Sequence, residues 1–155
     1  MKKIITVLAL VTSMFSAQAF AADDGKVTRE AREAFKREFP EATYPKWEKV
    51  EGTDLYMVRF YFESQGYVAY LDVDGELIGS ARLVGKDNLP FKVGQVIRQK
   101  YDDSEIMKIE ELTMGGSLSY LFTLNYKGSR MLLRVYSDGH VQKIKSEKNK
   151  DGKGF

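Results

Sequence analysis

The 155-residue sequence contains no cysteine, one histidine and one tryptophan. Without cysteine there can be no disulfide bonds, so a packed apolar core has to stabilise the fold. With one histidine and no thiolate, a zinc site would need three carboxylate ligands, which zinc seldom uses. We therefore predict no metal site and no cofactor.

The sequence also lacks the usual groupings of catalytic residues. His140 is the only imidazole available to a Ser-His-Asp triad, and no serine lies in a nucleophile-elbow motif. Glu110-Glu111 and Asp102-Asp103 are adjacent acids, which in a strand point to opposite faces. We interpret these four as solvated turn and edge residues, and we predict that the protein is not an enzyme.

Long apolar runs are absent except near the N-terminus. Lys2 and Lys3 precede an apolar stretch of about a dozen residues, whereas a membrane-spanning helix needs roughly 20. Small residues follow at Ala19 and Ala21, which indicates a cleaved signal peptide over residues 1–21. No cysteine follows, so a lipoprotein anchor is not predicted. We expect a periplasmic protein without a membrane anchor; an uncleaved anchor or a buried N-terminal strand is the alternative.

An excess of positive charge is missing once this leader is removed. The chain has 24 basic and 22 acidic residues, and Lys2 and Lys3 are the only charges in residues 1–21, which leaves 22 of each. A balanced charge does not favour nucleic-acid binding. The remaining 134 residues (155 minus 21) fit a single domain that buries roughly two-thirds of its unfolded surface.

An internal repeat is present. A shift of 64 residues places "LYMVRFYF" (55–62) on "SYLFTLNY" (119–126) and "VAYLDVDGEL" (68–77) on "LLRVYSDGHV" (132–141). The preceding segments "AFKREFPEA" and "VIRQKYDDS" match at a shift of 62. We predict two repeats, at about 27–84 and 89–144, followed by a flexible Lys-rich tail at 145–155.

Each repeat reads as one helix followed by three or four antiparallel strands. Apolar residues recur at helical spacing over 27–39, with Thr28 as N-cap and Pro40 as terminator, and again over 89–101, with Pro90 in the first turn. Alternating stretches predict the strands, at 47–50, 55–62, 67–73, 77–83, 106–112, 118–126, 131–136 and 141–144.

The Asp-Gly pairs lie between such stretches. Asp74-Gly75 and its repeat copy Asp138-Gly139 predict hairpins with type I′ turns. A calcium loop is the alternative for the first pair, but Ala81 occupies the position of its distal glutamate. "MGGSLS" (114–119) leads into a strand rather than a helix, so we interpret it as a strand connection.

The order of elements resembles the PepSY-like family of exported bacterial proteins, which is grouped with the beta-lactamase inhibitory protein. The resemblance rests on "AFKREFPEATYPKWEKV", "YMVRFYF" and "VAYLDVDGEL", and on "LPFKVGQVIRQKY", "YLFTLNY" and "RVYSDGHV" in the second repeat. It covers the chain from about 27 to 144. It implies an α+β fold, with one curved antiparallel sheet carrying helices on one face, and a binding or inhibitory role. No inhibitory loop can be transferred residue by residue.

The two faces of the predicted sheet differ from the usual pattern. Strand positions 56–62 and 120–126 of even number are apolar and should face the helices. The opposite face should be polar if it only meets water, yet it carries aromatic, Met and Arg side chains, which are enriched at interfaces. The candidate binding residues are Met57, Arg59, Tyr61, Tyr70, Arg134 and Tyr136. We expect Tyr61, Tyr70 and Tyr136 to be exposed within one patch.

We therefore expect a periplasmic, non-enzymatic module that binds a protein or peptide through the open sheet face. Two alternatives remain: a carrier of a small ligand and a self-associating protein such as a homodimer. Strand propensity alone would also explain many of these tyrosines and valines.

Overall fold

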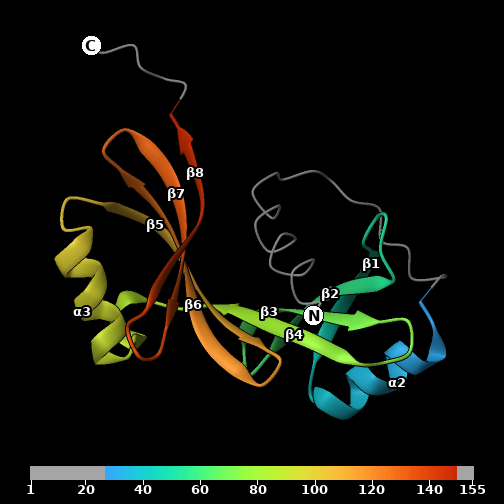
Figure 1. Ribbon diagram of the computed structural model, residues 1–155. Helices are drawn as coiled ribbons and strands as arrows, with labels where there is room; N and C mark the ends of the chain where they lie inside the picture. The colour runs from blue at the N-terminus through green and yellow to red at the C-terminus, as the bar shows by residue number, and fades with distance from the viewer. Residues whose placement is uncertain (1–26, 150–155) are drawn as a thin grey trace. The chain divides into compact units, whose positions relative to one another are not determined.

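The computed structural model describes residues 27–149 (Figure 1). The predicted signal peptide and the last residues of the predicted tail, 150–155, lie outside them. No helix of the described part is long and apolar enough to cross a membrane. The elements, in chain order, are α2 (Arg29–Glu38), β1 (Thr43–Lys49), β2 (Leu55–Phe62), β3 (Gln65–Asp72), β4 (Leu77–Leu83), the 3-10 helix η3 (Lys86–Asn88), α3 (Phe91–Lys100), β5 (Glu105–Met114), β6 (Ser117–Tyr126), β7 (Ser129–Tyr136) and β8 (Val141–Lys148).

The strands form one eight-stranded antiparallel sheet in chain order from β1 to β8. This confirms the α+β class. The chain divides into two compact units. Unit 1 comprises the chain up to Arg82 together with Thr113–Ser117, and unit 2 comprises Leu83–Leu112 and the chain from Leu118.

In unit 1, α2 begins at a side-chain cap. The Thr28 hydroxyl accepts a hydrogen bond from the Ala31 N–H (3.3 Å) and donates one to the Val73 carbonyl (2.8 Å). The first contact satisfies a helix N–H that has no partner within the helix, and the second ties the helix start to the chain just after β3. The helix ends at Glu38, two residues before Pro40, as the sequence predicted.

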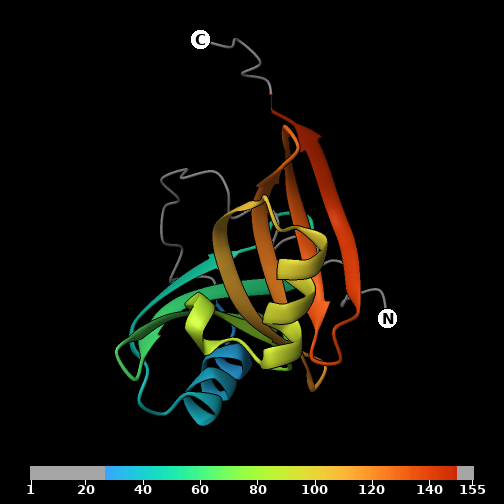
Figure 2. The ribbon, with the colours of Figure 1, turned by 90° about the vertical axis from the view of Figure 1, so that its left-hand side faces the viewer.

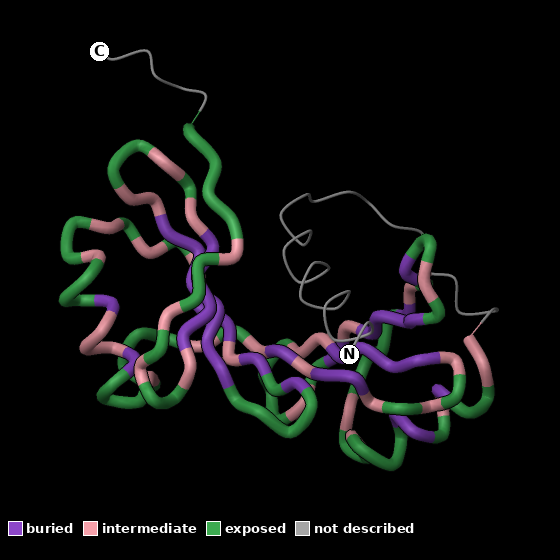
Figure 3. The backbone as a smooth tube through the Cα atoms, in the orientation of Figure 1, coloured by how far each residue is buried: buried purple, intermediate pink, exposed green. Residues whose placement is uncertain are grey.

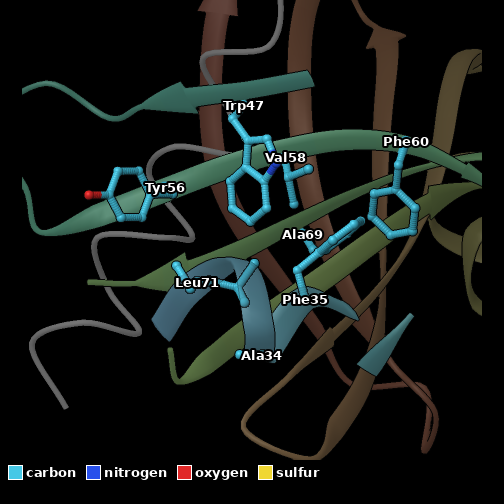
Figure 4. Packing of buried hydrophobic residues seen from close by; sticks show 9 residues of the cluster. Ala34, Phe35, Trp47, Tyr56, Val58, Phe60, Ala69 and Leu71 are labelled. Atoms are coloured by element: carbon cyan, nitrogen blue, oxygen red, sulfur yellow. The ribbon is translucent and has the colours of Figure 1, made fainter. Parts of the chain in front are cut away.

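The core of unit 1 is rich in aromatic rings (Figure 4). The ring of Phe35, from α2, lies 5.3 Å from Trp47 and 4.9 Å from Phe60 between centroids, both in edge-to-face geometry. Such pairs add to the gain from burying apolar area. The predicted helix-facing residues Tyr56, Val58 and Phe60 all belong to this core.

In unit 2, α3 covers one face of the strands (Figure 2), and its core is mainly aliphatic. Phe122, Leu124, Leu133 and Val135 are completely buried. Ile97 of α3 packs in the same cluster. Pro90 stands at the N-cap, one residue before the helix, rather than in its first turn as predicted.

The Asp-Gly turns are hairpin connections, but they are not of type I′. In the first, the Gly75 N–H bonds the Asp72 carbonyl (3.1 Å) and the Asp72 N–H bonds the Glu76 carbonyl (3.0 Å), and only Gly75 has positive φ (+86°). This is a type I turn followed by a left-handed glycine. The Asp72 carboxylate accepts from the N–H groups of Asp74 and Glu76, so it orders the turn rather than serving as a ligand group.

The type I′ geometry occurs at three other hairpins. Both central residues have positive φ at Glu63-Ser64, Gly115-Gly116 and Lys127-Gly128. The β2–β3 and β6–β7 registers close directly around two of these pairs, at Phe62↔Gln65 and Tyr126↔Ser129. The remaining pair, Gly115-Gly116, joins β5 to β6, which confirms that the glycine-rich segment connects two strands.

The first and last strands of the sheet carry different features. In β1 the register shifts between Thr43 and Lys46, which marks a bulge at Tyr44-Pro45. β8 continues to Lys148, past the predicted end at Ile144, so the first residues of the predicted tail are strand. Its exposed residues include Lys143, Lys145 and Glu147.

Candidate functional site

The candidate site is the sheet face opposite the helices. Buried and exposed stretches along the strands are mapped in Figure 3. The pairing confirms which side chains share this face, because directly opposed residues point the same way. In unit 1, Met57 pairs with Tyr70 and Arg59 with Val68. In unit 2, Leu121 pairs with Arg134 and Thr123 with Leu132.

Unit 1 places its three candidate aromatic and Met residues in different environments. Tyr61, near the end of β2, is 56% exposed, as predicted. Met57 is 8% exposed and Tyr70 only 1%, so the expected exposure of Tyr70 is wrong. The reason lies in the register. Tyr70 stands on β3 between Met57 and Gly79, in the middle of three adjacent strands, whereas Tyr61 is opposite Gly66 near a hairpin end.

Arg59 has a counter-charge on the same face. Its Nη2 lies 3.6 Å from Oε2 of Glu48 on β1, and the two side chains are 42% and 23% exposed. The Glu48 Oε2 atom is buried and accepts no hydrogen bond from the described residues. The ion pair therefore partly neutralises the guanidinium, while the exposed part of Arg59 remains available at the surface.

Sequence reasoning missed Tyr44, which is 79% exposed and has φ of +53°. Positive φ is uncommon outside glycine, and here it coincides with the β1 bulge before Pro45. Thr43 pairs with Tyr61, so both exposed tyrosines lie at one end of the β1–β2 pair. The Tyr-Pro dipeptide was the available signal, because proline in a strand marks an edge or a bulge.

In unit 2, Arg134 is nearly buried, with 8% exposure. Its Nε donates a hydrogen bond to the Ser119 hydroxyl (2.9 Å), and its guanidinium carbon lies 4.8 Å from the centroid of the Tyr136 ring. Tyr136 is half-buried, and its hydroxyl donates to Oε1 of Gln142 (3.2 Å). The predicted neighbours Arg134 and Tyr136 thus form one stacked pair.

Two further polar side chains of unit 2 are enclosed. Glu110 is 5% exposed, and Oε1 of its carboxylate lies 2.7 Å from the Lys108 ammonium, so its expected solvation is wrong. Thr123 is 1% exposed, and its hydroxyl forms no hydrogen bond with any of residues 27–149. Buried polar atoms without hydrogen-bond partners are rare in folded proteins, so each one needs a structural or functional explanation.

The remaining predicted chemistry is peripheral. His140 is exposed after its turn, as expected of a surface residue. Within residues 27–149, no group of three His, Cys, Asp or Glu side chains could hold a metal ion. The expected patch of three exposed tyrosines is wrong, because Tyr70 is buried; Tyr61 is exposed and Tyr136 is half-buried.

Comparison with known proteins identifies the fold. No protein-family model matches the sequence, and no curated protein is significantly similar to it. A BLIP-like protein from Bacteroides fragilis NCTC 9343 superposes with a TM-score of 0.70 at 18% identity, over 83% of this chain and 92% of that one. A candidate periplasmic protein from Bacteroides eggerthii DSM 20697 gives 0.70 at 12% identity, over 80% and 90%. A DUF2874 family protein from Bacteroides uniformis ATCC 8492 gives 0.68 at 12% identity, over 77% and 88%. The chain has the fold of these BLIP-like and DUF2874 proteins, as the resemblance implied.

Proposed function

We propose that the chain is an exported, non-enzymatic binding protein, built from two tandem repeats, that recognises a protein partner through the sheet face opposite its helices. The observation that carries the proposal is the composition of that face. It presents Tyr61 and Arg59 in unit 1 and the Arg134–Tyr136 pair in unit 2. Tyr and Arg are enriched among the residues that dominate binding energy at interfaces.

The contact surface that we propose for unit 1 differs from the one expected from the sequence. Tyr44 and Tyr61 supply exposed rings, and Arg59 supplies a partly exposed cation. Tyr70 is 1% exposed, and Met57 is 8% exposed and carries no charge that a partner could pair, so we assign both to support rather than to contact. A cationic, aromatic surface fits a partner with acidic and apolar side chains.

Export to the periplasm completes the proposal. It is supported by the predicted signal peptide and by the B. eggerthii neighbour, described as a candidate periplasmic protein. Mass spectrometry of the protein from its native host should give Ala22 as the N-terminal residue. An intact N-terminus at Met1 in all of the protein would refute cleavage.

The binding surface is tested by capture from the native host. The parent and a Tyr44→Ala/Tyr61→Ala variant are crosslinked in intact cells, and captured proteins are identified and then titrated in purified form. We expect a partner whose affinity falls at least about tenfold in the double variant, since each interface hot spot costs about 2 kcal/mol or more.

Phe91→Ala provides the matched control. Phe91 is 74% exposed and lies on α3. The substitution therefore removes an exposed ring from a helix, whereas the double variant removes two from β1 and β2. The proposal predicts undiminished binding for this control. Equal binding by the parent and the Tyr44→Ala/Tyr61→Ala variant would move the contact away from this end of unit 1.

A further inference from the structure

The environment of Arg134 differs from that of an ordinary structural arginine. Its guanidinium carries five N–H donors, and one of them, on Nε, bonds the Ser119 hydroxyl. Its other recorded contact is the stacking on Tyr136. Within residues 27–149, no carboxylate forms an ion pair with it, and its terminal nitrogens form no hydrogen bond.

This arrangement is costly for a residue that is 8% exposed. A buried charge is ordinarily paired, because removal from water penalises the ionised form unless an opposite charge compensates. The buried carboxylate of unit 2, that of Glu110, is already taken up by the Lys108 ammonium at 2.7 Å. Arg134 is therefore fixed in position but lacks a counter-ion among residues 27–149.

A second unsatisfied group lies on the same face. Arg134 is opposite Leu121 in the β6–β7 register, and Thr123 is the next residue of β6 on that face. The Thr123 hydroxyl is completely buried and has no hydrogen-bond partner in the part of the chain that the structure describes. Two polar side chains, each more than nine-tenths buried and each with unused hydrogen-bonding capacity, thus flank Leu121.

From this geometry we infer that Arg134 is a recognition site for a carboxylate, and specifically for an Asp or Glu side chain of the protein partner; this rests on the proposed function. The planar guanidinium fork matches a carboxylate in a bidentate arrangement. Ser119 and Tyr136 hold the fork in place, which lowers the entropy lost on binding. Thr123 provides a neighbouring hydroxyl.

The charge balance favours a carboxylate over a phosphate. Arg134 provides one unpaired positive charge, and Lys108 is engaged with Glu110. A monoanion neutralises that single charge, whereas a dianionic phosphate would leave a surplus negative charge in a largely buried environment.

The test uses two small probes that differ in charge but not in shape. N-acetyl-glutamate methylamide is titrated into the full-chain protein at constant ionic strength, and N-acetyl-glutamine methylamide serves as the control. The Nε–H signal of Arg134 is followed by NMR and is assigned by its loss in Arg134→Met. We expect this signal to shift with the glutamate probe only, with a dissociation constant on the order of millimolar, as suits so small a ligand.

Two variants sharpen the result. Arg134→Lys keeps the charge but loses the fork, and we expect about tenfold weaker binding of the glutamate probe. Ser119→Ala releases Nε, and we expect about fivefold weaker binding, the equivalent of one hydrogen bond.

Thermal unfolding separates recognition from a structural role. If Arg134 serves recognition, Arg134→Met should raise the Tm of the free protein, because an apolar side chain replaces a buried charge without a counter-ion. The glutamate probe should raise the Tm of the parent and leave that of Arg134→Met unchanged. A lower Tm for Arg134→Met, with Arg134→Lys close to the parent, would indicate a structural arginine.

Either an absent shift of the Arg134 signal or an equal shift with both probes would overturn the inference. Neither probe requires the partner. A negative titration alongside successful partner capture would therefore remove the carboxylate site alone, and a positive titration without capture would count against the proposed function alone.

Discussion

Tyr70 on β3 and Arg134 on β7 occupy corresponding positions, 64 residues apart, and both are nearly buried on the face opposite the helices. Their partners differ. In unit 1 the arginine on this face is Arg59, which lies on β2, the strand before β3, and has Glu48 as counter-charge. Unit 2 has Thr123 in that place, and no carboxylate of the described residues 27–149 pairs with Arg134. The strand positions that face the helices are apolar in both units. The two units therefore share the residues that form their cores and differ in the polar residues of the opposite face.

The largest effect is expected in the two cores. Phe35→Ala removes a ring with three aromatic neighbours, Phe39, Trp47 and Phe60, and should lower the free energy of unfolding by about 4 kcal/mol. Its counterpart at a shift of 62, Ile97→Ala, should cost about 3 kcal/mol. Urea unfolding followed by circular dichroism measures both.

Trp47, the only tryptophan, lies in unit 1 and reports on that unit by fluorescence. If Ile97→Ala shifts the dichroism and fluorescence transitions equally, the units unfold together. A fluorescence transition that stays in place while the dichroism transition moves would show that unit 2 unfolds separately.

Tyr70→Ala should cost about 3 kcal/mol, because the side chain is 1% exposed and its loss leaves a cavity. Tyr61→Ala, 56% exposed on the neighbouring strand, should change stability by no more than about 0.5 kcal/mol. Chemical denaturation of both variants tests the division into supporting and contacting tyrosines. If both variants lost a similarly small amount of unfolding free energy, Tyr70 would not be a buried supporting residue and would belong to the contact surface.

The two Asp-Gly turns differ in the space beside the glycine. A Cβ on Gly75 would lie 2.7 Å from the Glu30 carbonyl oxygen, whereas the nearest atom to a Cβ on Gly139 would be the Lys92 oxygen at 4.0 Å. Both glycines have positive φ, which costs other residues about 1 kcal/mol. Gly139→Ala should lose about that much and Gly75→Ala about 2 kcal/mol, since α2 must also shift. Equal losses would mean that α2 moves freely.

The smallest effect is expected at the Glu48–Arg59 pair. Glu48→Gln should cost about 0.5 kcal/mol, because the partly exposed charges are 3.6 Å apart and screened by water. A double-mutant cycle with Arg59→Gln measures the coupling, which should shrink with added salt. A coupling that salt leaves unchanged would indicate a far drier environment than the exposures suggest.

Sequence periodicity predicted the scaffold well for a geometric reason. Side chains alternate strictly along a strand, so Tyr56, Val58 and Phe60 could be assigned to the helix side from spacing alone. The helix start at Thr28 followed from the same local logic, since capping depends on neighbouring residues.

The failures concern features that depend on distant partners. The burial of Tyr70 is set by pairing with Met57 and Gly79, which spacing along one strand does not reveal. The type I′ turn at Glu63-Ser64 contains neither Asn nor Gly, and the pairing of Phe62 with Gln65 imposes it. Glu110 is enclosed because Lys108, two residues earlier on β5, lies on the same face and pairs with its carboxylate, a contact that the adjacency of Glu110 and Glu111 does not indicate.

The two outer strands have a consequence for colloidal behaviour. β1 interrupts its free edge with the Tyr44-Pro45 bulge, and β8 carries charged side chains at the alternate positions Lys143, Lys145 and Glu147. An unguarded edge invites other chains to add strands, which ends in fibrils. On β1, Pro45 has no N–H to donate to an added strand. On β8, the lysines would repel the lysines of a second copy. Both outer strands therefore oppose polymerisation of the chain through its own backbone, even at high protein concentration.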